Sequence, residues 1–467
     1  MRVADLRAEA HRRDVIGIGE CSPRLSWITV TDTPSWHQAG YEVEIDGRAG
    51  GRVDSDASVL VPWPEAPLAS RSRSTVRVRV WGTDGSETPW SDPLTVEVGL
   101  VEATEWLASW ITPAVEDPRD TASAAPLFRR SFDVADREIE RARLYVTSAG
   151  VHQVHLNGQV VGDHVLAPGW SSYQNRLRYD THDVTSLLVG GENVIGAVVA
   201  DGWWRGFLKW DMLRNVYGDR LGLFAQLEIT YADGTTDVTV TDENWCTTTG
   251  PFVTADLYQG ENYDARRELD GWDRPGFDDR AWEPAVGFDP EVGRLVAPPG
   301  PPVRRIEEIR VREVLTSPAG ATVLDFGQNL VGRVRLTVHG EAGTVVTLRH
   351  AEVLEHGEPA YRPLRNAEAT DRYTLRGGGP ETYEPTFTFH GFRYVEVAGW
   401  PGELDPDAIV AVVLHSDMER IGTFTCDNEL LEQLHSNVVW GMRGNFLDVP
   451  TDCPQRDERL GWTGDLQ

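Results

Sequence analysis

Cysteine is scarce in this chain of 467 residues, and its four cysteines lie far apart without a Cys-x-x-Cys pair: Cys21, Cys246, Cys426 and Cys453. So few thiols favour neither a disulfide framework nor a zinc site. No apolar run approaches the ~18 residues that span a bilayer, and the segment Met1–Asp14 has no apolar core of signal-peptide length. We therefore expect no membrane partner and a cytoplasmic protein.

Positive charge is also in deficit, with 44 Lys and Arg against 73 Asp and Glu, a formal net charge of −29. A field of this sign repels phosphate backbones, so nucleic acid is not an expected partner. The sequence has no GxxxxGK[ST] loop, no HExxH and no GxSxG motif. Gly17-Ile-Gly19 lacks the third glycine of a dinucleotide fingerprint and is interpreted as a turn. We expect no cofactor.

What the chain does have is a series of short alternating segments that predict β-strands. Tyr41–Ile45 and Val76–Trp81 have the period of two that half-buried strands need, and Asp46-Gly47 and Asp84-Gly85 supply turns beside them. Residues 1–103 are therefore predicted to form a small antiparallel β-sandwich of the fibronectin III or immunoglobulin type.

A second β region follows, at residues 104–300. Its predicted strands include Arg143–Thr147 and Val151–Leu156, and Asn157-Gly158 is a strong hairpin signal. The stretch Pro113–Pro126 is predicted to be a loop, and the stiff segment Ala297–Pro302 a boundary between domains.

The third β region, residues 301–416, is followed by a change of period. Its predicted strands are Val331–Val338, Thr344–Arg349 and Phe392–Val397. After Asp417, apolar residues fall at helical spacing, with Asp427 or Asn428 placed to cap the helix start; they are Leu430, Leu431, Leu434, Val438 and Met442. The fold class is thus mainly β, with three consecutive antiparallel sandwiches and a helical segment at residues 417–467.

The 17 tryptophans allow two interpretations, because an indole serves either in a sandwich core or against a sugar ring. The segment Asp201–Gly206, together with Trp210, is the best aromatic cluster for a secondary sugar contact. Core packing is the alternative.

The segment Asp448–Asp465 has the densest chemistry: five acids, two arginines and a tryptophan, interrupted by two prolines and two glycines. Such a segment is predicted to be a loop whose side chains converge. Cleavage of a glycosidic bond needs one carboxylic acid to protonate the leaving oxygen and others to stabilise an oxocarbenium-like transition state. Neighbouring carboxylates raise one another's pKa, which keeps one of them protonated. Composition alone also fits a solvated loop with local Arg–Asp pairs.

The strip Asp452–Asp465, Asp-Cys-Pro-Gln-Arg-Asp-Glu-Arg-Leu-Gly-Trp-Thr-Gly-Asp, resembles the catalytic signature of the bacterial α-L-rhamnosidases, glycoside hydrolase family 78. The resemblance extends over nearly the whole chain. Cys21–Trp27 is similar to the opening fibronectin-like domain of the family, and Val151–Trp170 to its N-terminal jelly-roll, galactose-binding-like sandwich. Asp325–Asn329 and Phe389–Tyr394 are similar to the sandwich that precedes the catalytic domain.

Carried over residue by residue, the resemblance implies that Glu458 is the general acid. Asp452 and Asp465 would hold the rhamnose hydroxyls with help from Arg456, and Trp462 would line the pocket. Asp457 matches no functional position and is interpreted as a structural partner of Arg456 or Arg459.

The resemblance further implies an (α/α)6 barrel whose general base lies far downstream of this motif. Twelve helices of ~11–12 residues joined by loops of ~4–6 need roughly 200 residues, whereas 467 − 417 leaves 50 after Asp417. We therefore expect a barrel that is cut short, either in a fragment of a longer enzyme or in a broken gene. We also expect this chain to be inactive without its base. Glu352 and the carboxylates near Asp371 are candidates to approach the site, and strand-edge charges are their alternative interpretation.

Two main functions follow, and a different α-L-glycosidase built on the same helical barrel is a third possibility. The first is inverting hydrolysis of terminal non-reducing α-L-rhamnose by the complete protein, with rhamnose-terminated glycosides or oligosaccharides as partners. The second is a carbohydrate-binding or scaffold protein of β-sandwiches with a vestigial catalytic strip. Some relatives carry a calcium-dependent rhamnose-binding module; its ligands do not match here, so a structural calcium is not assigned to any residue.

Overall fold

The computed structural model describes residues 1–12, 15–115 and 121–466, without the side chains of the last two residues. The first sandwich has a five-stranded sheet in the order β2-β7-β6-β4-β5, and β1 pairs with β3 beside it. The predicted strands Tyr41–Ile45 and Val76–Trp81 lie within β4 and β6 and are confirmed. The strand bounds are β1 (Arg2–Ala8), β2 (Val15–Ile18), β3 (Leu25–Val30), β4 (Gln38–Ile45), β5 (Arg48–Ala49), β6 (Arg73–Gly82) and β7 (Leu94–Val98).

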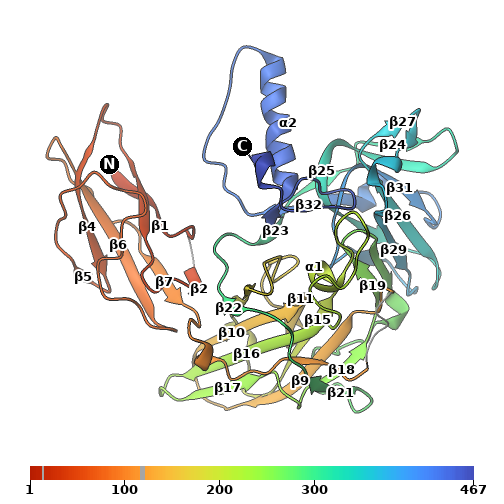
Figure 1. Ribbon diagram of the computed structural model, residues 1–467, viewed down its shortest axis with the longest axis horizontal. Coiled ribbons are helices and arrows are strands. Elements are labelled where there is room, and N and C mark those ends of the chain that lie inside the picture. The colour runs from red at the N-terminus through yellow and green to blue at the C-terminus, as the bar shows by residue number, and fades with distance from the viewer. Residues whose placement is uncertain (13–14, 116–120, 467) are drawn as a thin grey trace.

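This first sandwich stands to one side of the molecule and meets the second through the end of β7 (Figure 1). The buried Arg143 donates to both oxygens of Glu97, at 2.6 and 2.9 Å. The hydroxyl of Tyr179 donates to the carbonyl of Leu100 at 2.8 Å. Because a buried charge is stable only when it is paired, the Arg143–Glu97 contact fixes where the two domains join.

The second sandwich contains an eleven-stranded sheet in which β16 pairs with β10, β8 and β17. Asn157 and Gly158 have positive φ angles of 51° and 82° and connect β11 to β12, which confirms the predicted hairpin. The elements are η1 (Ala103–Glu105), β8 (Ile111–Pro113), β9 (Pro126–Val134), β10 (Ile139–Ala149), β11 (Val151–Leu156), β12 (Gln159–Val160), β13 (Arg176–Arg178), β14 (Asp180–Asp183), η2 (Thr185–Leu187), β15 (Gly191–Ala200), α1 (Gly202–Arg205), β16 (Gly222–Tyr231), β17 (Thr236–Val240), β18 (Cys246–Thr249), η3 (Ala265–Arg267), β21 (Glu283–Gly287) and β22 (Arg294–Val296). Part of the predicted loop Pro113–Pro126, residues 116–120, lies outside the described residues.

The third sheet takes in a hairpin from earlier in the chain. β19 pairs with β20, and β20 runs parallel to β29, so residues 252–264 join strands that follow the linker 297–302. This exchange brings the turn between β19 and β20 against the C-terminal segment. The elements are β19 (Phe252–Asp256), β20 (Gly260–Asp264), β23 (Val303–Arg310), β24 (Glu313–Thr316), β25 (Thr322–Val338), β26 (Val345–Ala351), β27 (Leu354–Glu355), β28 (Glu358–Pro359), η4 (Arg362–Leu364), β29 (Thr370–Thr374), β30 (Glu381–Tyr383), β31 (His390–Ala398), η5 (Pro406–Ala408) and β32 (Ile409–Ser416).

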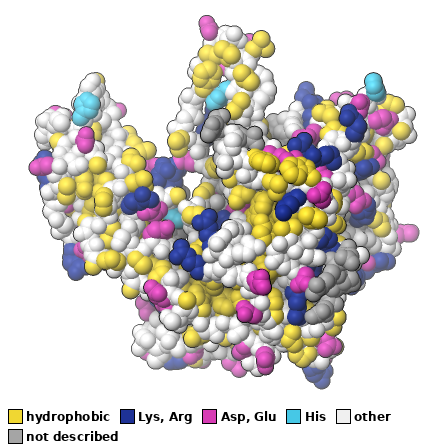
Figure 2. Space-filling view, in the orientation of Figure 1, with side chains coloured by type: hydrophobic (Ala, Val, Ile, Leu, Met, Phe, Trp, Pro, Cys, Tyr) yellow, Lys and Arg dark blue, Asp and Glu magenta, His cyan; other side chains and the backbone are white. Residues whose placement is uncertain are grey.

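A single long helix, α2 (Glu429–Asn445), follows the third sandwich, and the side chain of Asn428 caps it by accepting from the N–H of Leu430 at 3.0 Å. The predicted helix and its cap are confirmed. Its apolar stripe is exposed, with Leu430 at 80% and Val438 at 59%, and hydrophobic side chains gather over this projecting part of the surface (Figure 2). The chain then passes through β33 (Phe446–Leu447), β34 (Val449–Pro450) and η6 (Thr463–Leu466). In the described part of the chain, no helix is long and apolar enough to cross a membrane.

A buried carboxyl fastens β20 to the third sheet. Glu261, 1% exposed, accepts from the backbone N–H groups of Thr386 and Phe387, both at 2.9 Å, and from the hydroxyl of Tyr383 at 3.1 Å. Burial raises the pKa of Glu261 to about 7, although the two backbone hydrogen bonds lower it in part. The folded chain therefore holds this proton more tightly than the unfolded chain, whose carboxyl has the ordinary pKa of 4.5.

Because the folded-state pKa is raised, the stability that Glu261 contributes is complete below pH 4.5 and is lost as the pH rises through about 7. Glu261→Gln should remove this loss. The free energy of unfolding of the variant relative to the parent should rise by up to ~3 kcal/mol between pH 4.5 and 8. Urea unfolding across this range measures the difference, and Glu403→Gln, at an exposed carboxylate, is the control. Parallel pH profiles for the parent and Glu261→Gln would contradict the raised pKa.

Candidate active site

The segment 448–465 begins with a tie to the second sandwich. The carboxylate of Asp448 accepts from Arg178, with an Nη1–Oδ1 distance of 2.7 Å and a second contact from Nη2. It also accepts from the backbone N–H of Trp170. Asp448 is thus a structural anchor in a charge-assisted pair.

A second tie reaches the third sandwich through Asp457, which is 1% exposed. Its Oδ1 lies 2.5 Å from Nε of Arg365, and its Oδ2 accepts from Asn366 at 2.8 Å. The expected partner is Arg456 or Arg459; the ion pair is with Arg365, and the charge of Asp457 also acts on Arg459. A sequence carries no sign of this pairing, because Arg365 lies 92 residues upstream, in a loop that only the fold brings near.

The third tie is Arg459, whose side chain is 1% exposed. Its Nη1 donates to the carbonyls of Leu257 at 2.7 Å and of Phe389 at 3.2 Å. The guanidinium carbon lies 4.9 Å from the ring centre of Tyr258 and 4.7 Å from that of Phe389. Hydrogen bonds and cation–π contacts of this kind compensate for the loss of water around the charge.

Between these ties, Glu458 has a backbone φ of +116°, a value that residues other than glycine rarely adopt. The hydroxyl of Tyr258 donates to its carbonyl at 2.6 Å. Strain of this kind costs about 1–3 kcal/mol and persists only where surrounding contacts impose it. Here the turn between β19 and β20 supplies one such contact, through the hydroxyl of Tyr258.

The carboxylate of Glu458 is surrounded by donors, although the residue is only 6% exposed. Its Oε2 accepts from Arg365 and Arg456, both at 3.0 Å, and its Oε1 accepts from the indole of Trp462 at 3.2 Å. The donors come from the third sandwich and from the loop itself. Arg456 also lies 3.8 Å from Asp452, so one guanidinium spans both carboxylates.

Asp452 and Glu458 form a coupled pair with pKa values shifted in opposite directions. Burial raises the pKa of Asp452, and the adjoining Glu458 raises it further. Burial also acts to raise the pKa of Glu458, but hydrogen bonds from Trp210, Arg365, Asp452 and Trp462 outweigh it and leave this pKa below its ordinary value. The raised pKa is therefore that of Asp452, whereas the resemblance implies an acid at Glu458.

Two half-exposed indoles flank this pair. Trp210 is 46% exposed and Trp462 is 47% exposed, and their ring centres lie 6.3 Å apart. The backbone of Lys209 bridges to that of Glu458. Trp210 thus lies beside the segment 448–465, while Trp203 and Trp204 of the same predicted aromatic cluster are core residues, each 2% exposed.

Two carboxylates upstream of this segment, Glu352 and Asp371, also differ in their surroundings. Glu352 is half-buried, accepts from Asn329 at 2.8 Å and is close enough to Arg456 for that charge to lower its pKa, although burial dominates and the net shift is upward. Asp371 is fully buried and accepts from His390 at 3.1 Å. The side chain of Asp465 is outside the described part of the chain, which leaves its predicted role open.

Two groups of residues have the composition of metal ligands. Asp452, Cys453 and Glu458 are one, and burial raises the pKa of Cys453 to about 11, so this residue is a thiol. In the other, the rings of His350 and His390 are stacked 4.1 Å apart at 25°, both next to Asp371. We assign no metal ion to either group.

The sequence motif did not reveal Arg365, Tyr258 and Trp210, which complete the surroundings of Glu458. Arg365 and Tyr258 lie in turns of the third sheet, outside any recognisable pattern. Only Trp210 had a signal, as part of an aromatic cluster. Contacts that form between domains leave no trace in local spacing.

Family models match four segments of the chain. They are a Rha78A-like N-terminal immunoglobulin domain (3–102), an α-L-rhamnosidase N-terminal domain (137–307), a bacterial α-L-rhamnosidase concanavalin-like domain (315–415) and a bacterial α-L-rhamnosidase six-hairpin glycosidase domain (419–467). The last model spans the helix α2 and the segment 448–465.

Curated relatives include an α-L-rhamnosidase of Streptomyces avermitilis, 35% identical over 97% of this chain and 61% of its own length, and one of Alteromonas sp., 36% identical over 96% and 51%. A crystal structure of an Aspergillus terreus rhamnosidase is 47% identical, with a TM-score of 0.96 over all of this chain and 55% of its own. The structure of the Streptomyces avermitilis enzyme complexed with L-rhamnose is 35% identical over all of this chain and 62% of its own, with a TM-score of 0.95. The chain spans about half to three fifths of the length of these relatives, and it belongs to the α-L-rhamnosidase family of glycoside hydrolases.

Proposed function

We propose that the complete protein hydrolyses terminal, non-reducing α-L-rhamnose from rhamnosides with inversion at the anomeric carbon. The observation that carries this proposal is the carboxylate of Glu458, held by Arg365, Arg456 and Trp462 beside a second carboxylate, Asp452. A coupled pair of carboxyls with divergent pKa values is the arrangement that separates proton donation from charge stabilisation. The relative solved in complex with L-rhamnose supports the choice of sugar.

In this mechanism Glu458 delivers a proton to the glycosidic oxygen as the bond to the anomeric carbon breaks. Because the surrounding hydrogen bonds lower the pKa of Glu458, the proposal requires a bound substrate to displace some of them, so that Glu458 can carry the proton. Arg456, within 3.8 Å of Asp452 and 3.0 Å of Glu458, stabilises the anion that the transfer leaves behind.

The remaining residues bind the sugar. The half-exposed indoles of Trp462 and Trp210 offer flat faces to the C–H side of a pyranose ring. Asp452, Arg456 and Asp465 are proposed to hold the rhamnose hydroxyls. Trp210 comes from the second sandwich, so this domain takes part in substrate binding.

An inverting enzyme needs a general base on the opposite face of the sugar, about 6.5–9.5 Å from the acid. Since the chain spans only 51–61% of its curated relatives, we propose that this base belongs to sequence beyond residue 467. The 467 residues alone are then inactive.

Substitutions in an enzyme with the complete catalytic domain test these roles. Glu458→Gln should reduce kcat/KM by ~10²–10⁴-fold on a rhamnoside with a poor leaving group, but far less on an aryl rhamnoside with an acidic phenol, which needs little protonation. Asp452→Asn should reduce both alike. Equal losses on both substrates for Glu458→Gln would remove it as the acid. The 467-residue chain, assayed alongside, should show no turnover; turnover that Glu458→Gln abolishes would refute the placement of the base.

The protonation of Glu458 in the 467-residue chain should depend on Arg365, because its hydrogen bond lowers the pKa of Glu458. Arg365→Gln should therefore raise that pKa. Carbon NMR of labelled glutamate carboxyls measures it, with the Glu458 signal assigned by its loss in Glu458→Gln. Arg362→Gln is the matched control, three residues away and 82% exposed, and should leave the signal unchanged. Identical titration curves for the two arginine variants would show that Arg365 does not hold the carboxylate.

A further inference from the structure

A cavity of about 470 Å³ lies between the second and third sandwiches. One wall comes from β11 and β15, the other from β20, β29 and β30, and the segment 268–274 closes one side. Among the described residues that line it, none belongs to the segment 448–465. The cavity is therefore separate from the candidate active site, and the proposed mechanism does not use it.

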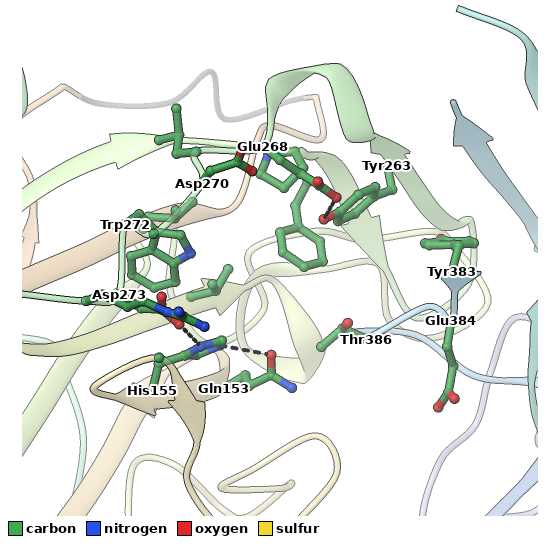
Figure 3. A pocket seen from close by; sticks show the side chains of 18 of the residues that line it. Gln153, His155, Tyr263, Glu268, Asp270, Trp272, Asp273, Tyr383, Glu384 and Thr386 are labelled. Carbon is green, nitrogen blue, oxygen red and sulfur yellow. Dashed lines mark hydrogen bonds and ion pairs between the residues drawn. The ribbon is translucent and has the colours of Figure 1, made fainter. Parts of the chain in front are cut away.

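The first wall presents fixed polar groups. Nδ1 of His155 lies 2.8 Å from Oδ2 of Asp273, and Nε2 of His155 lies 3.2 Å from Oε1 of Gln153. The hydrogen bond from His155 lowers the pKa of Asp273, which is therefore an ionised acceptor at neutral pH. The indole of Trp272 adjoins this group, its ring centre 5.2 Å from that of His155, and its nitrogen points toward the enclosed space (Figure 3).

The opposite wall carries carboxylates that are held from behind. Glu384 pairs with Arg333 and Arg305, both at 2.8 Å. Glu268 accepts from the hydroxyl of Tyr263 at 2.8 Å. In Figure 3 Tyr263 and Tyr383 lie across the opening from the His155–Trp272 wall, and the Glu384 side chain extends downward beneath Tyr383.

The segment that carries Trp272 is rigidly supported. The buried Arg129 donates to the carbonyl of Trp272 at 2.8 Å and to that of Arg274 at 3.3 Å, and it pairs with Asp279. The indole stacks on Trp282, with ring centres 6.3 Å apart. Because these contacts fix the lining before any ligand arrives, binding would lose little to ordering of the site.

We propose that this cavity is a second saccharide-binding site, which accepts one or two residues of a neutral sugar. Its volume lies within the ~300–1,000 Å³ of small-molecule sites. The lining offers carboxylate and amide oxygens, which accept from sugar hydroxyls, together with an indole that is suited to a pyranose ring. The ionised Asp273 lies beside His155 and Trp272, where its negative charge disfavours an anionic sugar. Arginines already pair with Glu384, Glu268 and Asp270, which leaves little attraction for a cation.

Saturation-transfer NMR on the 467-residue chain tests the proposal, with the methyl glycosides of L-rhamnose, D-galactose, D-glucose and D-xylose as probes and that of D-glucuronic acid as the anionic comparison. At least one neutral glycoside should bind with a dissociation constant near ~1 mM, and the glucuronide at least 10-fold more weakly. Trp272→Ala and, as the milder change at a half-buried side chain, Gln153→Ala should each weaken binding at least 5-fold. Trp462→Ala, in the catalytic loop, should not.

Three results would overturn the proposal: no transfer from any neutral glycoside, equal binding of the glucuronide, or loss of binding in Trp462→Ala alone. The last would assign the sugar to the catalytic loop. The ligand class follows from the lining of the cavity alone, so sugar binding in the cavity and rhamnoside hydrolysis are tested independently. A complete enzyme that fails on rhamnosides would leave the result for this cavity unaffected.

Discussion

The buried guanidinium of Arg459 is the contact on which the site depends. It is held between the rings of Tyr258 and Phe389 and donates to the carbonyls of Leu257 and Phe389. Removing a cation from water is costly unless its hydrogen bonds are replaced, so the segment reaches this position only when both the turn between β19 and β20 and the third sheet are folded. The buried position of Arg459 also fixes the strained backbone and the orientation of Glu458, the residue before it.

The second and third β-sandwiches contact the carboxylates of the segment 448–465 directly. Arg178 of the second sandwich pairs with Asp448. Arg365 of the third sandwich pairs with Asp457 and Glu458. Trp210, from a loop of the second sandwich, donates a hydrogen bond to the carboxylate of Glu458. Because the β19–β20 hairpin pairs with the third sheet, the second and third sandwiches support the segment 448–465 together. Contacts from both sandwiches therefore position Glu458 and lower its pKa.

Much of this could be predicted from the sequence. Strands such as Tyr41–Ile45 and the capped helix at 429–445 follow from local periodicity. The motif 452–465 is a contiguous signature, so the family could be recognised from it, and the family models confirm the family. The roles of its residues stay predictions. The contacts of Arg365 and Tyr258 could not be predicted, because they join residues 93 and 200 positions apart in the chain. The opposite pKa shifts of Asp452 and Glu458 could not be predicted either, since they depend on how many donors the fold directs at each carboxylate.

The dependence of the catalytic loop on its buried cation can be measured by amide hydrogen exchange. The amides of Leu460 and Asp452 report on the loop directly, because Leu460 donates to Asp452 Oδ1 and Asp452 donates to the carbonyl of Leu460. In Arg459→Met, which keeps the length of the side chain but removes the charge, these amides should exchange at least 10-fold faster. Amides in the central strands β25 and β16 should be unchanged. Unaltered protection of Leu460 in that variant, with the strands still folded, would contradict the view that Arg459 holds the site in place.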